Sequence, residues 1–138
     1  QERTRIDSLN EISYKLRKSD PQKSMRLGQT AMKLSSDYNY SEGKSRAYLN
    51  IGNAYRYLMQ VDSGTYILRQ GILFDLSQKN NEEDDKYNSL GLLFKRISET
   101  DSALFYFEHA LNSRKLTNDS LAMASIYNNI GNVYKKIG

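Results

Sequence analysis

A glycine-centred motif occurs three times in the chain and limits the folds open to it. The copies begin at Tyr48, Tyr87 and Tyr127, so the motif recurs after 39 and then 40 residues, and they read YLNIGNAY, YNSLGLLF and YNNIGNVY. In each copy an aromatic, an apolar residue, the glycine and a second aromatic follow the i, i+3, i+4, i+7 spacing of one helical stripe. A steady period of this length predicts a stacked array of similar helical units.

The glycine of each copy predicts a close contact between helices. A glycine inside a helix costs about 1 kcal/mol relative to alanine, so its recurrence requires a compensating contact. A second small residue follows twelve positions later, Gly64 after Gly52 and Ala103 after Gly91. We therefore expect pairs of antiparallel helices that approach closely where neither carries a bulky side chain. Six glycines are expected at packing positions: Gly28, Gly52, Gly64, Gly71, Gly91 and Gly131.

These residues resemble the tetratricopeptide repeat family. The family pattern, aromatic, Leu-Gly and aromatic on one helix, then small, aromatic, small and apolar on the next, is filled by Tyr87, Leu90, Gly91, Phe94, Ala103, Phe107, Ala110 and Leu111. The preceding hairpin has Leu68 instead of the second helix's aromatic, the usual proline is missing, and the period exceeds the common length of about 34 residues. The resemblance implies an all-α, right-handed superhelical solenoid of antiparallel hairpins, with about three and a half repeats and seven helices.

One domain is expected over residues 1–138, with repeats at about 4–40, 41–80 and 81–118 and a half repeat at 119–138. The first repeat is degenerate, as terminal repeats usually are. Its expected apolar positions are Ile6, Leu9, Ile12 and Leu16, with Ser13 in the place of the glycine. The chain begins without Met and ends within a repeat, which predicts a piece of a longer protein.

Helix boundaries are expected from capping residues. Asp20 precedes Pro21, an N-cap followed by proline at the first helical position. Asp62-Ser63 and Asp101 are expected to cap later helices, and residues 37–43 to form a loop. The acidic run 82–85 suits a helix N-terminus, where the helix dipole favours negative charge.

Composition is that of an ordinary globular protein, with 38% hydrophobic and 26% charged residues. The absence of cysteine excludes thiol catalysis and thiolate metal sites, and it suits a cytoplasmic or a periplasmic location equally. No apolar run is long enough to cross a membrane, so no membrane contact is expected from this segment. The net charge of +4 would favour an acidic partner, although a simple solvated surface is the preferred interpretation.

Motifs for catalysis or cofactor binding are incomplete. The sequence EGKS at 42–45 ends like a phosphate-binding loop but lacks the earlier glycine that such loops need. His109 is the only histidine and offers neither a metal cluster nor a catalytic triad. We therefore expect no enzyme activity, no metal and no cofactor. Tyrosines at the motif positions are expected in the core: Tyr48, Tyr55, Tyr87, Tyr127 and Tyr134.

A ligand groove is expected beside the buried stripe of each first helix. Its asparagines both donate and accept hydrogen bonds, as an extended peptide backbone requires, and its basic residues can hold a carboxylate. The expected groove residues are Arg46, Leu49, Asn53, Arg56, Asn88, Leu92, Lys95, Asn128, Asn132 and Lys135. The resemblance implies a peptide ligand but not the family's chaperone-binding carboxylate clamp, because Leu49, Asp85 and Leu92 interrupt its pattern.

The expected function is non-catalytic binding of a protein or peptide segment. The motif is similar to tetratricopeptide sensor regions of bacterial two-component kinases and transcription regulators, which implies an interaction segment for signal transduction. Two alternatives remain open. One is self-association through the uncovered face of the last helix; the other, weaker one is nucleic-acid binding, which the core positions of the tyrosines disfavour.

Overall fold

The chain folds into α-helices joined by short turns. A computed structural model describes residues 1–80 and 82–137, leaving out the side chains of 115–117. The helices are α1 (Glu2–Leu16), α2 (Pro21–Asp37), α3 (Ser41–Tyr57), α4 (Val61–Gln78), α5 (Glu83–Arg96), α6 (Thr100–Thr117) and α7 (Ser120–Ile137). The all-α class predicted from the motif is therefore confirmed, and the described residues contain no strand.

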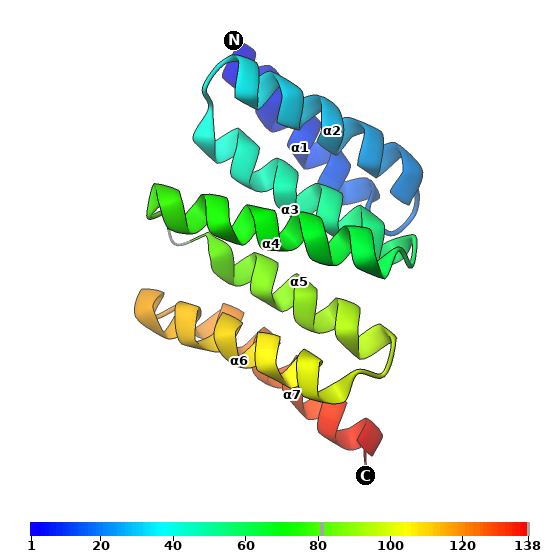
Figure 1. Ribbon diagram of the computed structural model, residues 1–138. Coiled ribbons are helices and arrows are strands. Elements are labelled where there is room, and N and C mark those ends of the chain that lie inside the picture. The colour runs from blue at the N-terminus through cyan, green and yellow to red at the C-terminus, as the bar shows by residue number, and fades with distance from the viewer. Residues whose placement is uncertain (81, 138) are drawn as a thin grey trace.

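Helices follow one another back and forth from the N-terminus at the top of Figure 1 to the C-terminus at the bottom. Each packs against its neighbour in sequence, and α1 also contacts α3, α3 contacts α5, and α5 contacts α7. Within the described residues no comparable contact joins α2 to α4 or α4 to α6. The odd-numbered helices thus lie closer together than the even-numbered ones, which form the other side of the stack.

Glycine sets the closest approaches between paired helices. A Cβ placed on Gly52 would overlap the side chain of Leu68 on α4, and one on Gly91 would lie 2.5 Å from the ring of Phe107 on α6. Both Leu68 and Phe107 are fully buried. The predicted packing role is confirmed for these glycines, because each leaves room for the large residue of the facing helix.

In the last copy of the motif, the predicted burial of the tyrosines and the glycine is wrong. Tyr127 and Tyr134 are 53% and 58% exposed, and a Cβ on Gly131 would meet nothing within 4 Å. The buried residues of α7 are instead Ile126 and Val133, which join the cluster around Phe107. The expected core positions are wrong here because no helix among the described residues covers that stripe of α7.

The first helix also differs from expectation. Ile12 is 46% exposed and Asn10 is buried, which was not predicted, whereas Ile6 and Ser13 are buried as predicted. Ser13 Oγ donates to the carbonyl of Ser24 at 2.7 Å, and Ser24 Oγ donates to the carbonyl of Ser13 at 2.6 Å. Reciprocal hydroxyl bonds therefore join α1 to α2 at the place where other hairpins use glycine.

Helix starts were only partly predicted. Asp20 accepts from the backbone N–H of Lys23 at 3.1 Å, as expected of an N-cap before Pro21. Asp62 and Asp101 are not caps but lie in the first turns of α4 and α6. The reason is the tight turn before each helix, where Met59 and Ser98 adopt positive φ and the next helix starts at once.

The loop predicted over residues 37–43 is shorter, because α3 already begins at Ser41. Gly43 lies inside α3, where a Cβ would stand 2.6 Å from Ser35 Oγ and from the ring of Tyr40. This glycine was not predicted to pack, since it falls outside the repeated motif.

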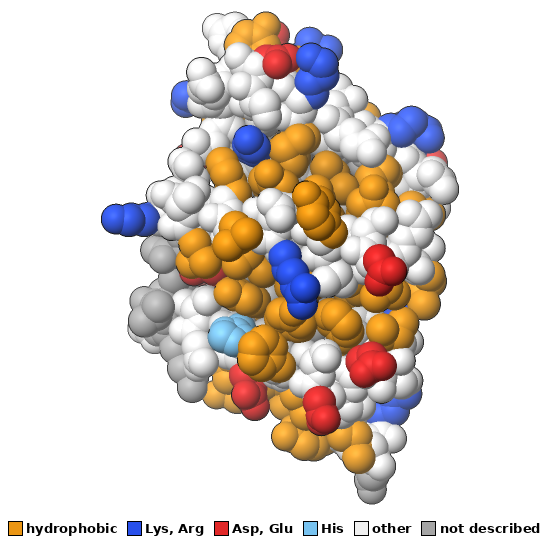
Figure 2. Space-filling view, viewed as in Figure 1, with side chains coloured by type: hydrophobic (Ala, Val, Ile, Leu, Met, Phe, Trp, Pro, Cys, Tyr) orange, Lys and Arg blue, Asp and Glu red, His pale blue; other side chains and the backbone are white. Residues whose placement is uncertain are grey.

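The face of the molecule seen in Figure 2 is formed largely by the even-numbered helices and carries exposed apolar side chains over α4 and α6. The most exposed large apolar side chains of these two helices are Tyr66 and Leu73 on α4 and Phe105 on α6, which are 65%, 61% and 56% exposed. His109, the pale blue side chain, makes an edge contact with Phe105 and stacks on Tyr87. The histidine thus has an aromatic packing role.

Candidate ligand-binding pocket

A pocket of about 490 Å³ opens among the odd-numbered helices α1, α3 and α5. Its size lies within the range of small-molecule and side-chain binding sites. The residues that line it are Asn10, Glu11, Tyr14, Ser45, Arg46, Leu49, Asn50, Glu82, Asp85 and Lys86.

Two buried amides form part of the pocket lining. Asn10 donates from Nδ2 to the carbonyl of Gly43 at 3.0 Å, and Asn50 donates from Nδ2 to the carbonyl and to Oδ1 of Asn10, both at 3.0 Å. The two residues are only 1% and 3% exposed. They join α1 to α3 and give the pocket a rigid polar wall.

The orientation of these amides follows from the backbone carbonyls that they meet. A carbonyl oxygen can only accept, so the atoms of Asn10 and Asn50 that face Gly43 O and Asn10 O must be the NH₂ groups. Asn50 Oδ1 is then left without a hydrogen-bond partner in the described part of the chain. Because Asn50 lines the pocket, this oxygen is an acceptor available to a ligand.

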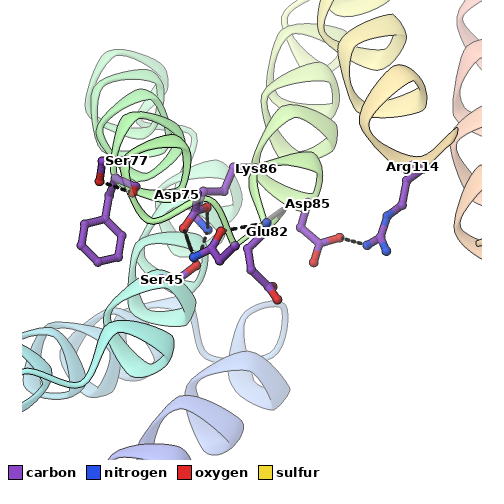
Figure 3. Close-up of polar contacts among 9 residues, drawn as sticks. Ser45, Asp75, Ser77, Glu82, Asp85, Lys86 and Arg114 are labelled. Carbon is purple, nitrogen blue, oxygen red and sulfur yellow. Dashed lines mark hydrogen bonds and ion pairs between the residues drawn. The ribbon is translucent and has the colours of Figure 1, made fainter. Parts of the chain in front are cut away.

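A buried ion pair stands behind the pocket and ties three helices together (Figure 3). Lys86 on α5 donates to Asp75 Oδ2 on α4 at 2.5 Å and to Ser45 Oγ on α3 at 3.0 Å. Ser45 Oγ donates to Asp75 Oδ1 at 2.6 Å, and Asn80 Nδ2 donates to the same oxygen at 3.3 Å. The charges of Lys86 and Asp75 therefore compensate each other inside the fold.

The position of the Lys86 side chain explains why residue 71 of α4 is a glycine. A Cβ on Gly71 would lie 2.8 Å from both Cδ and Cε of Lys86, so glycine makes space for the lysine stem. An ammonium group has three N–H donors, and two are used by Asp75 and Ser45. Lys86 also contributes to the pocket lining, although its side chain is only 2% exposed.

The wall on α1 and α3 carries mixed chemistry. Glu11 pairs with Lys15 at 2.9 Å on the exposed surface of α1, and the hydrogen bond and charge of Lys15, with a smaller effect of Arg46, lower the pKa of Glu11. Arg46 is exposed and makes no ion pair within the described residues. Leu49 is half-buried beside it and adds apolar surface.

The wall at the start of α5 is acidic. Arg114 of α6 bonds Asp85 at 2.7 Å, Asp119 at 3.3 Å and, through Nε, Asp84. Burial, followed by the neighbouring charge of Asp85, raises the pKa of Asp84 to about 6. Glu82 is exposed, and Figure 3 shows its side chain and that of Asp85 leaving the start of α5 on the same side.

The predicted groove residues do not gather at one site. Arg46 and Leu49 line the pocket. Asn53 is 4% exposed and accepts from Ser89 Oγ at 2.8 Å and from Arg56 at 3.3 Å. The bond from Ser89 links α5 to α3, and Arg56 is itself buried.

The remaining predicted residues lie towards the C-terminal end. Asn88 Oδ1 accepts from Asn129 of α7 at 3.1 Å, Leu92 packs on the cluster around Phe107, and Lys95 lines a separate pocket of about 200 Å³ with Lys136. Asn128, Asn132 and Lys135 are exposed on α7.

Sequence reasoning missed the two amides that face the pocket, although a signal existed. Asn10, Asn50 and Asn129 occupy equivalent positions in their repeats, and Asn10 and Asn50 are 40 residues apart. Ser89 occupies the equivalent position in the repeat between Asn50 and Asn129. The predicted groove contained the neighbouring asparagines of the motif instead, because the repeat does not show which flank of each helix remains uncovered.

The EGKS sequence lies within α3, where Ser45 is held by Asp75. No group of three or more potential metal ligands occurs in the residues that the structure describes, and none of their helices is long and apolar enough to span a membrane. No protein-family model matches the sequence, and no curated protein is significantly similar to it.

Proposed function

We propose that this chain is a non-catalytic scaffold that binds an extended protein or peptide segment in the pocket among α1, α3 and α5. The observation that carries the proposal is the rigid amide wall, in which Asn50 Oδ1 is an unused acceptor that a ligand can reach. An extended peptide presents backbone N–H groups along its length, and one of them can satisfy this acceptor.

The arrangement of the helices supports the same proposal. In the described part of the chain the odd-numbered helices contact one another and the even-numbered ones do not, which is the spacing expected when the odd-numbered helices line the inner side of a curved stack. We infer from it, and from the repeated glycine motif, a right-handed superhelical solenoid of the tetratricopeptide type. Such stacks present extended binding surfaces on the inner side.

A place in bacterial signal transduction is proposed on the motif resemblance alone. The amide and glycine motif is similar to that of sensor regions in two-component kinases and transcription regulators. The complete gene tests this point: a kinase or DNA-binding domain in the same product would support it, and an unrelated enzyme domain would contradict it.

A phage-displayed library of random linear peptides provides the probe for the binding site. Peptides enriched on the wild-type chain are synthesised, and their affinity is measured by fluorescence anisotropy for Arg46→Glu and for Arg26→Glu, an exposed arginine on α2. We expect Arg46→Glu to weaken binding by about tenfold or more and Arg26→Glu to change it by less than about twofold. No enriched peptide, or equal effects of the two variants, would contradict the proposed site.

A second candidate is self-association through α7. Its exposed stripe contains Tyr127, Tyr134 and Ile137, each more than half exposed, and the surface above Gly131 is open. On α3 and α5 the same motif positions are covered by a partner helix. A second chain covering this stripe would bury apolar area that is otherwise left in water.

A further inference from the structure

The pocket has opposite electrostatic character at its two ends. On the α3 side, Arg46 is a cation without an ion pair among the described residues, while Glu11 has its own partner in Lys15. On the α5 side, Glu82 is a carboxylate without an ion pair in that same part of the chain. Lys86 does not alter this difference, because Asp75 compensates its charge.

The acidic end is more negative than the lining residues alone suggest. Arg114 is shared by Asp84, Asp85 and Asp119, so one positive charge faces three carboxylates. Glu82 lies beside this cluster and contributes to the raised pKa of Asp84. At neutral pH the start of α5 therefore holds an excess of negative charge at the edge of the cavity.

An independent observation points to a ligand in the same pocket. Asn50 is only 3% exposed, yet its side-chain Oδ1 accepts no hydrogen bond in the described structure. This oxygen is not among the fully buried side-chain atoms that lack a partner, so it stays accessible from the pocket that Asn50 lines. It would be satisfied by an N–H donor entering the pocket, and a cationic side chain supplies such donors.

We propose that the bound segment places a lysine or arginine side chain in this pocket, with its charged group at the α5 end near Glu82 and Asp85. The inference rests on the proposed peptide-binding function and specifies the chemistry of the ligand. The apolar stem of such a side chain can lie along Leu49, since lysine and arginine bury their methylene groups while the charge stays near polar groups. Arg46 at the other end suits a backbone carbonyl or a carboxylate of the same segment.

A cationic ligand is the opposite of what the net charge of the chain suggests. The chain carries a formal charge of +4, which favours an acidic partner at long range. Short-range recognition is set instead by the groups within a Debye length of the ligand, roughly 8 Å at physiological salt. At the α5 end of the pocket those groups are mainly carboxylates.

The test uses capped peptide pools that are random except for one fixed residue, which is lysine, glutamine or glutamate. Acetylated and amidated ends remove the charges of the termini. Binding to the wild-type chain is compared with Glu82→Gln, Glu82→Lys and the matched control Glu108→Gln, an exposed glutamate on α6. Glu82 makes no side-chain cap bond to α5, so its replacement does not remove a helix cap.

We expect the lysine pool to bind best and the glutamate pool worst on the wild-type chain. Glu82→Gln should weaken the lysine pool by about fivefold, while Glu108→Gln changes it by less than about twofold. Glu82→Lys should reverse the order of the lysine and glutamate pools.

Failure of this inference is distinguishable from failure of the proposed function. If pools bind and Arg46→Glu weakens them, but lysine gives no advantage or Glu82→Lys leaves the order unchanged, the cation assignment is wrong while peptide binding stands. If no pool binds at the pocket, the proposed function is wrong, and the cation assignment fails with it.

Discussion

At the scale of single residues, the same amino acid in the same motif has different consequences at different places. Gly91 lies against the buried ring of Phe107, whereas Gly131 faces open space. The motif predicted close contact for both, because a sequence shows that a position is glycine but not whether a helix covers it. Asn50 and Asn53 differ in the same way: one lines the pocket and the other is held inside by Ser89.

Alanine substitution separates the two glycines. Gly91→Ala should lower the free energy of unfolding by about 1–3 kcal/mol, because the added methyl group collides with a fully buried ring. Gly131→Ala should raise it by about 0.5–1 kcal/mol, since alanine favours the helix and meets no atom. Urea unfolding followed by circular dichroism gives both values. A loss of stability in Gly131→Ala as large as in Gly91→Ala would show that the α7 stripe is covered.

At the scale of helices, the sequence predicted the pairing well and the surfaces less well. The period-40 motif and its small residues were sufficient to pair α3 with α4 and α5 with α6, because glycine inside a helix is costly unless a neighbouring helix packs closely against it. The face of α1 was partly misassigned, because Asn10 makes a polar contact with α3 that apolar periodicity cannot reveal. The bond from Lys86 to Asp75 was also invisible, since it joins helices through side chains that normally lie on the surface.

The uncovered stripe of α7 allows a prediction about self-association. If the second candidate function is correct, light scattering should show a mass that rises with protein concentration towards that of a dimer. The double variant Tyr127→Lys/Tyr134→Lys should then remain monomeric, because it places charges in the stripe, and the exposure of both tyrosines means that the fold should tolerate it. A wild-type chain that stays monomeric at high concentration would exclude this candidate.

At the scale of the whole molecule, the closely spaced odd-numbered helices and the separated even-numbered ones create two different faces. One holds a polar pocket with two rigid amides and opposite charges at its ends. The other carries scattered apolar side chains over α4 and α6 (Figure 2). The proposed recognition lies on the first face, and the resemblance of the motif to peptide-binding repeats favours the same face without identifying the residues involved.

The most direct measurement is a ¹H–¹⁵N nuclear magnetic resonance titration of the labelled chain with a peptide selected from the random library. We predict that the side-chain NH₂ signals of Asn10 and Asn50, and backbone signals of α1, α3 and the start of α5, shift as the peptide binds. Signals of Tyr66, Leu73 and Phe105 on the other face should stay in place. Shifts confined to that other face or to α7, with the two asparagine amides unchanged, would contradict recognition at the pocket.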